Sequence, residues 1–356
     1  MVEKRELKCV IAAGGTAGHV LPALAVAEEL QKRGVRVSFA GSPDRVEARL
    51  VPEAGYEFDA FRSSGLPRRA GVALVRAFAT AAAAPAACLR ILRRRRPDVV
   101  LGAGGYVSGP MVLAAAVQRT PAALLEADAH LGLANRLAAP FAKRIFLAAP
   151  ISGHDGSKFH VTGRPVPQRS LARPSGKARA TFELPAEGPV LLVLGGSQGA
   201  LRLNELAVER WGADGPAVLH LCGERDYEAL RDRVTRPDYR LLPFTAEIGA
   251  AYGASDLALA RAGGSVWELA AAGLPAVLVP YPHATADHQT KNARQLEAAG
   301  GAVVVPESEL DRIPALVDEL LADEPRRERM RRAMLAVARP GAAAEIAEEL
   351  VALASA

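Results

Sequence analysis

Four glycine-rich segments each follow a short apolar run and precede a helical pattern. They are residues 14–19 (GGTAGH), 102–106 (GAGGY), 195–199 (GGSQG) and 261–265 (RAGGS). A chain that repeats strand, tight turn and helix builds a parallel sheet with helices on both faces. A single turn of this kind is weak evidence. Four of them, at the carboxyl ends of predicted strands, indicate a phosphorylated ligand, because the helix that follows offers free N–H groups to an anion.

The order of the apolar runs predicts two doubly wound α/β domains. Strands are expected at residues 7–13, 35–40, 98–101, 122–125 and 144–147, and then from 190 and at 217–221, 239–242, 257–260, 276–279 and 302–305. Turn-forming residues between 164 and 175 place the boundary there. We therefore expect an N-terminal domain over 1–164, a C-terminal domain over 165–339, a deep cleft between them, and a helix at about 340–356 that packs back on the first domain.

Composition narrows the class of protein. Half of the 356 residues are hydrophobic and 23% are charged, which is typical of a globular chain. The three cysteines lie far apart and match no disulfide framework or zinc pattern, so a reduced, cytosolic home is expected. The N-terminal apolar run ends in glycines and is not a signal peptide, and the longest apolar stretch, between Arg76 and Arg90, is too short to cross a bilayer.

The charge is unevenly placed. Residues 60–97 contain nine arginines and no acidic residue, although the net charge of the whole chain is only +5. Such a segment suits nucleic acid, anionic lipid or a phosphorylated ligand, or it is simply the solvated face of a helix. Few aromatic residues lie among the arginines, which disfavours nucleic acid as a partner.

The motifs that are missing exclude several ligand classes. The chain has no GxxxxGK[ST] loop, no full GxGxxG spacing, no acidic residue at the end of the second predicted strand and no DxD pair. P-loop nucleotide hydrolysis, dehydrogenation and metal-dependent sugar transfer are therefore disfavoured. A nucleotide diphosphate bound by backbone N–H groups remains. In the segments 261–275 and 279–293, the carboxylate of Glu268 is suited to ribose hydroxyls. A second predicted helix start carries His288 and Gln289, and the amide of Gln289 is suited to sugar hydroxyls.

Taken together, the motifs resemble those of the MurG family. The similarity runs from about residue 10 to 302 and includes GGTAGHVLPALAVAEEL, GAGGYVSGP, LLVLGGSQGALRLNE, SDLALARAGGSVWELAAAGLPAVLVPYP and ADHQTKNA. It implies a GT-B glycosyltransferase with two Rossmann-like domains. That enzyme would move GlcNAc from UDP-GlcNAc to the 4-hydroxyl of MurNAc in lipid I (undecaprenyl-diphospho-MurNAc-pentapeptide), with inversion and without metal or cofactor, and so form lipid II for peptidoglycan. It would act as a peripheral protein at the cytoplasmic side, with the arginine-rich segment 60–97 binding an anionic membrane surface.

The resemblance also implies a role for individual residues. Donor binding is expected from Thr16, Ala17, Gly18, Asp128, Arg164, Ser197, Thr245, Gly263, Gly264, Ser265, Glu268, His288 and Gln289. The acceptor diphosphate is expected at Gly14, Gly15, Gly104, Gly105 and Tyr106. Either His19 or Glu126 is the general base, although Glu126 could instead pair with Arg136. Trp267 is expected in the core.

Several positions depart from the family pattern. Ala17 replaces a glycine, residues 125–128 read LEAD where HEQN is usual, residues 163–167 read GRPVP where GNPVR is usual, and His288 replaces the first of two glutamines. Alternatives remain open at this stage: a UDP-GlcNAc 2-epimerase, another UDP-sugar enzyme of the GT-B class, or a nucleotide-sugar binder without activity.

Overall fold

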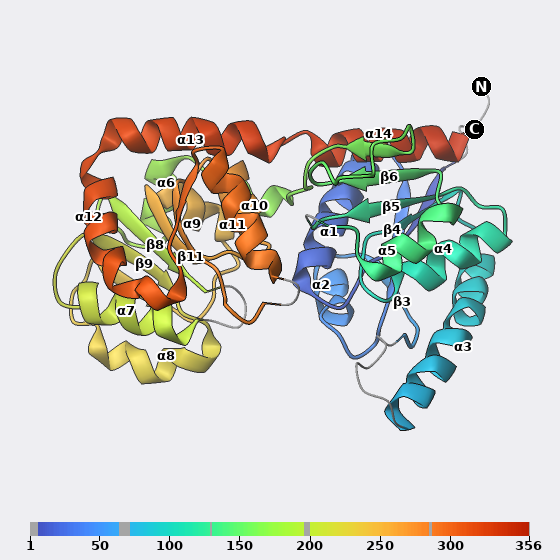
Figure 1. Ribbon diagram of the computed structural model, residues 1–356, viewed down its shortest axis with the longest axis horizontal. Coiled ribbons are helices and arrows are strands. Elements are labelled where there is room, and N and C mark those ends of the chain that lie inside the picture. The colour runs from blue at the N-terminus through green and yellow to red at the C-terminus, as the bar shows by residue number, and fades with distance from the viewer. Residues whose placement is uncertain (1–5, 64–71, 129, 196–199, 285–286, 356) are drawn as a thin grey trace. The chain divides into compact units, whose positions relative to one another are not determined.

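The chain forms two compact units, each built on one parallel sheet (Figure 1). The computed structural model describes residues 6–63, 72–128, 130–195, 200–284 and 287–355 of the 356. Unit 1 comprises Met1–Pro167 and Pro340–Ala356, and unit 2 comprises Gln168–Arg339.

Unit 1 has a seven-stranded sheet in the order β3-β2-β1-β4-β5-β6-β7, with every neighbouring pair parallel. Its strands are β1 (Lys8–Ala12), β2 (Arg36–Gly41), β3 (Glu57–Ala60), β4 (Val99–Gly102), β5 (Ala122–Glu126), β6 (Arg144–Leu147) and β7 (Phe159–Val161). Its helices are α1 (Ala17–Lys32), α2 (Glu47–Glu53), α3 (Val72–Arg95), α4 (Ser108–Val117), α5 (Leu133–Ala138), the 3₁₀ turn η1 (Ala139–Phe141) and α14 (Ala342–Ser355).

Unit 2 has a six-stranded parallel sheet in the order β10-β9-β8-β11-β12-β13. Its strands are β8 (Val190–Leu194), β9 (Ala217–Leu221), β10 (Tyr239–Leu242), β11 (Leu257–Arg261), β12 (Ala276–Val279) and β13 (Ala302–Val304). Its helices are η2 (Gln168–Ser170), α6 (Ser175–Thr181), α7 (Leu201–Trp211), α8 (Glu224–Leu230), η3 (Arg231–Arg233), α9 (Ile248–Ala254), α10 (Val266–Ala271), α11 (His288–Ala298), η5 (Glu307–Arg312), α12 (Ile313–Ala322) and α13 (Glu324–Ala338).

The α/β class and the two Rossmann-like sheets are confirmed. All eleven strands that the apolar runs predict are present, with ends within two residues of those expected. The sequence pattern missed β3 and β7, which are short strands at the two edges of the first sheet. Edge strands bury only part of their surface, so they carry little of the apolar signal that marks a central strand.

The strand order explains why the glycine turns matter. The chain reverses direction across the sheet between β1 and β4 in unit 1, and between β8 and β11 in unit 2. The segments after these four strands are the four glycine-rich segments. In open α/β sheets, ligands bind beyond the carboxyl ends of the strands at such a switch point.

The last helix of the chain belongs to the core of unit 1. Ile346, Ala347 and Leu350 of α14 are fully buried in the same apolar cluster as β1 and α1. Cys9, Cys88 and Cys222 are buried and free, and Trp267 is buried as expected. Among the described residues, no helix is both long and apolar enough to span a membrane.

Candidate functional site

The two glycine turns of unit 1 pack directly on each other. A Cβ atom on Gly105, whose φ is +72°, would lie 2.1 Å from the carbonyl oxygen of Gly14. A Cβ atom on Gly104 would lie 2.5 Å from Cδ2 of His19. Only glycine allows such an approach of backbone to backbone and backbone to ring. The structure therefore brings four residues of the predicted acceptor site, Gly14, Gly15, Gly104 and Gly105, against one predicted base.

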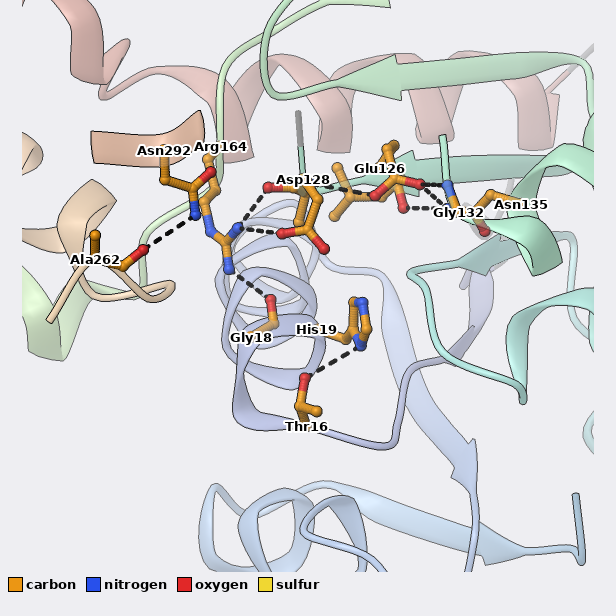
Figure 2. A network of polar contacts seen from close by, with 12 residues as sticks. Thr16, Gly18, His19, Glu126, Asp128, Gly132, Asn135, Arg164, Ala262 and Asn292 are labelled. Carbon is orange, nitrogen blue, oxygen red and sulfur yellow. Dashed lines mark hydrogen bonds and ion pairs between the residues drawn. The ribbon is translucent and has the colours of Figure 1, made fainter. Parts of the chain in front are cut away.

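His19 lies in the first turn of α1, half-buried, with one ring nitrogen engaged. Its Nδ1 is 3.1 Å from the carbonyl oxygen of Gly14. It is also 3.3 Å from Oγ1 of Thr16 (Figure 2). A carbonyl oxygen can only accept, so the bond to Gly14 requires the proton to be on Nδ1. Nε2 then carries the lone pair, and no described residue bonds to it. This tautomer is the one that a general base needs.

Glu47, which no sequence pattern indicated, supports the first glycine turn. Its side chain is fully buried at the start of α2. One carboxylate oxygen accepts from the N–H of Gly15 and the other from the N–H of Ser42, each at 3.0 Å. The Gly15 N–H, expected to serve the acceptor diphosphate, thus has a partner within the protein.

Glu126 ends β5 and is almost fully buried. Its carboxylate accepts from the N–H of Asp128 at 3.1 Å, the N–H of Gly132 at 2.8 Å and Nδ2 of Asn135 at 3.0 Å (Figure 2). Burial raises the pKa of Glu126, although these three hydrogen bonds oppose the rise. The partners are backbone groups and an amide rather than Arg136. The carboxylate thereby fixes the loop that follows β5.

Arg164 holds that same loop against α1. Its guanidinium is buried, donates to the carbonyl oxygens of Ala127 and, at 2.7 Å, of Gly18, and lies 3.7 Å from Asp128 (Figure 2). The Gly18 carbonyl would normally accept from the N–H four residues later, but that residue is Pro22, which has none. Arg164 supplies the missing donor. Three predicted donor-site residues, Gly18, Asp128 and Arg164, are therefore joined.

In unit 2, Gly263, Gly264 and Ser265 lead into α10. Among the residues that the structure describes, none accepts a hydrogen bond from the backbone N–H of these three. Gln289, in the first turn of α11, accepts from the N–H of Tyr281 at 2.9 Å, and its Nε2 would lie 3.9 Å from a Cβ atom on Gly263. His288 begins α11 as expected. The β11–α10 turn and the start of α11 thus lie together.

Glu268 is half-buried on α10 and fixed by two hydroxyl groups. Its carboxylate accepts from Oγ of Ser170 at 3.0 Å and from the hydroxyl of Tyr252 at 2.8 Å. Burial, together with this carboxylate, raises the pKa of Tyr252 well above its ordinary value. The orientation of the side chain predicted to meet a ribose is thus set by α9 and η2. Sequence spacing did not indicate either partner.

Two further predicted donor-site residues are Thr245 and Ser197. Oγ1 of Thr245 accepts from the N–H of Glu247 at 3.0 Å, and the neighbouring Phe244 is 70% exposed. Ser197 lies outside the described residues. No group of three or more histidine, cysteine or acidic side chains is close enough to hold a metal ion within the described part of the chain.

Comparisons with known proteins agree along most of the chain. Residues 9–147 match the glycosyltransferase family 28 N-terminal domain, and residues 190–349 match the glycosyltransferase family 28 C-terminal domain. Proteins named UDP-N-acetylglucosamine–N-acetylmuramyl-(pentapeptide) pyrophosphoryl-undecaprenol N-acetylglucosamine transferase are similar. The one from Acidithiobacillus ferrooxidans is 42% identical over 95% of this chain and 95% of its own. The one from Halothermothrix orenii is 37% identical over 94% of this chain and 96% of its own.

Solved structures show the same architecture. The crystal structure of Acinetobacter baumannii MurG matches with a TM-score of 0.73 and 29% identity, covering 98% of this chain and all of that one. A UDP-N-acetylglucosamine 2-epimerase matches with a TM-score of 0.65 and 14% identity, over 98% of this chain and 96% of that one, a likeness of fold alone. The chain therefore belongs to glycosyltransferase family 28, and within it to the MurG family of N-acetylglucosamine transferases.

Proposed function

We propose that this protein transfers GlcNAc from UDP-GlcNAc to the 4-hydroxyl of MurNAc in lipid I, with inversion at the anomeric carbon, and so forms lipid II for peptidoglycan. The observation that carries the proposal is the match, over about 95% of the chain, to transferases named for this donor and acceptor. The placement of a glycine-rich turn at the switch point of each sheet supports it, because both substrates carry a diphosphate.

His19 is the general base of the proposed reaction. Its Nδ1–H is held by Gly14, so Nε2 is left to take the proton of the acceptor hydroxyl as that oxygen attacks the anomeric carbon. Glu126 is less suited, because its two oxygens already accept three hydrogen bonds and it is buried. We assign it the role of holding the loop that carries Asp128.

UDP leaves from the opposite face of the sugar, and its diphosphate gains negative charge as the bond breaks. The backbone N–H groups of residues 263–265 are suited to receive that charge, since no described residue uses them. Donors fixed in place before the reaction stabilise such a transition state without reorganising. Glu268, held by Ser170 and Tyr252, would accept from the ribose hydroxyls.

The decisive experiment incubates the protein with radiolabelled UDP-GlcNAc, with and without a lipid I analogue. Label should enter the lipid fraction only when the acceptor is present. Without acceptor, formation of UDP-N-acetylmannosamine, or of free N-acetylmannosamine with release of UDP by water, would favour the epimerase alternative, and binding without turnover would favour a nucleotide-sugar binder. Either result would refute the proposal.

We also propose that unit 1 docks peripherally on the anionic cytoplasmic face of the membrane. Leu133 and Leu137 of α5 and Phe141 of η1 expose 53%, 66% and 48% of their surface. Lys143 and Lys158 line a surface hollow together with Phe141. Apolar side chains beside basic ones are typical of surfaces that bind anionic lipid, and each basic group contributes about 1 kcal/mol.

Vesicle flotation tests the docking. Binding should be stronger to vesicles with anionic lipid than to neutral ones, and it should weaken with salt. Leu137→Glu should reduce it, whereas Leu335→Glu, at a partly exposed position of unit 2, should not. Equal binding of both variants, or equal binding to both kinds of vesicle, would contradict the docking surface.

A further inference from the structure

The peptide group between Gly14 and Gly15 is bonded to two side chains. Its N–H donates to Oε2 of Glu47 at 3.0 Å, and its carbonyl oxygen accepts from Nδ1 of His19 at 3.1 Å. The N–H and the carbonyl of one peptide are conjugated through the partial double bond between them. A carboxylate and an imidazole are therefore connected through a single polarisable unit.

Burying the Glu47 carboxylate costs desolvation free energy, and the need to hold the neighbouring loop does not account for that cost. Its carboxylate is fully buried, and no described lysine, arginine or histidine forms an ion pair with it. A buried carboxylate held only by neutral N–H groups is expensive to desolvate. Holding the end of β2 would need only the bond to Ser42, but the second oxygen is directed to the glycine turn.

Two glycines make room for this carboxylate. A Cβ atom on Gly14 would lie 2.3 Å from Oε1 of Glu47, and one on Gly41 would lie 2.7 Å from its Cγ. Both distances are shorter than any normal contact, so neither position tolerates a side chain without movement of Glu47. The position of the carboxylate beneath the turn is thus specified from both sides.

We infer that Glu47 is a positioning residue for the reaction: acting through the Gly14–Gly15 peptide, it fixes the Nδ1–H tautomer of His19 and so keeps Nε2 free to accept a proton. The inference rests on the proposed role of His19 as base. A carboxylate that accepts from the N–H of Gly15 shifts electron density within the peptide group toward the Gly14 oxygen. That oxygen becomes a stronger acceptor for Nδ1–H of His19, because hydrogen bonds in a chain strengthen one another. An isolated neutral imidazole favours the other tautomer, so the protein must supply this preference. A carboxylate bonded directly to a catalytic histidine has the same effect in other enzymes.

Ring position and tautomer have separate causes in this arrangement. The ring lies where a Cβ atom on Gly104 would be, and the hydroxyl of Thr16 is 3.3 Å from Nδ1, so both positions limit where the ring can lie. The hydroxyl of Thr16 can donate or accept, so it does not select a tautomer. The carbonyl of Gly14 can only accept, so it selects the Nδ1–H tautomer, and Glu47 strengthens that carbonyl as an acceptor.

Nitrogen NMR of protein labelled with ¹⁵N-histidine tests the tautomer directly. The wild-type His19 signal, assigned with a His19→Gln sample, should show Nδ1 protonated and Nε2 bare. Glu47→Gln should produce a mixture of tautomers. The side-chain amide of the glutamine offers a neutral acceptor oxygen to the N–H of either Gly15 or Ser42, and it faces the other N–H with an NH₂ donor. Asp59→Asn is the matched control. Asp59 is also a buried carboxylate of unit 1, but it bonds to Arg94 and Arg95, so the tautomer should not change.

Kinetics separate this role from a structural one. Glu47→Gln should lower kcat about tenfold, the loss typical of removing a group that orients a catalytic side chain, with KM for UDP-GlcNAc within about twofold. In a His19→Ala background the same change should alter kcat by less than about twofold, since Glu47 then has no base to orient. Equal losses in both backgrounds, or an unchanged tautomer in Glu47→Gln, would overturn the inference and leave the proposed function standing.

A measurement on the wild type remains if Glu47→Gln does not fold. The Gly15 amide should be protected from hydrogen exchange, and its proton should resonate downfield, as expected for a bond to a carboxylate. Exchange at the rate of an unprotected amide would refute the link. A failure of GlcNAc transfer in the wild type would instead refute the proposed function, because neither NMR measurement depends on turnover.

Discussion

Removing Arg164 should destabilise unit 1 in a way that depends on Pro22. The guanidinium is 4% exposed and donates to the carbonyls of Gly18 and Ala127, which are 146 and 37 residues away along the chain. Arg164→Met keeps much of the side-chain volume and removes both donors. The Gly18 carbonyl then loses this donor, and Pro22 has no N–H to replace it within α1.

The size of the effect follows from these two bonds. A hydrogen bond to a charged donor contributes about 1.5–3 kcal/mol, and recovered desolvation of the charge offsets part of the sum. We expect a loss of about 3 kcal/mol in the unfolding free energy of unit 1, or about 6–12 °C in Tm for a unit of this size. In a Pro22→Ala background the loss should be about 1–2 kcal/mol smaller, because the N–H of the introduced alanine can then bond to the Gly18 carbonyl within the helix.

Hydrogen exchange of peptides from β1 and β5 measures the stability of unit 1. Tryptophan fluorescence serves as the control, since both tryptophans of the chain, Trp211 and Trp267, are in unit 2. The fluorescence transition should move much less than the exchange of β1. Losses for Arg164→Met that agree within about 0.5 kcal/mol in the two backgrounds would show that the arginine does not substitute for the missing helical bond.

Three other outcomes follow from the structure. His19→Ala should lower kcat at least ~10²-fold, measured with the lipid I analogue, and a smaller loss would remove it as base. Gly105→Ala should abolish activity and destabilise unit 1 in thermal melts, because its φ is +72° and a Cβ atom would lie 2.1 Å from the Gly14 oxygen; a near-normal melt would contradict that contact. Burial lowers the pKa of His220 from 6.5 to about 3 in the folded state. Between these two pH values only the unfolded chain binds the proton. The unfolding free energy of unit 2 should therefore fall as pH falls from 6.5 toward 3. At pH 5 the loss is about 2 kcal/mol, and His220→Gln should flatten the dependence in denaturant titrations at several pH values; an unchanged slope would rule His220 out as its cause.

The central strands and the glycine turns could be predicted because their signals are local. A strand buried on both faces is apolar along its whole length, as in β8 (VLLVL), and a turn that must bring backbone close to a ligand requires glycine. The edge strands β3 and β7 carry no such pattern.

The sequence by itself determined the repeated strand–turn–helix units and the family, and it predicted a set of residues for the site. Only the tertiary structure decided how those residues are held. Glu47 reaches Gly15 across 32 positions, Arg164 reaches Gly18 across 146, and Tyr252 reaches Glu268 from a different helix. Hydrogen bonds between distant segments leave no periodicity in the chain, because each partner is an ordinary polar residue until folding removes water and brings the other within about 3 Å.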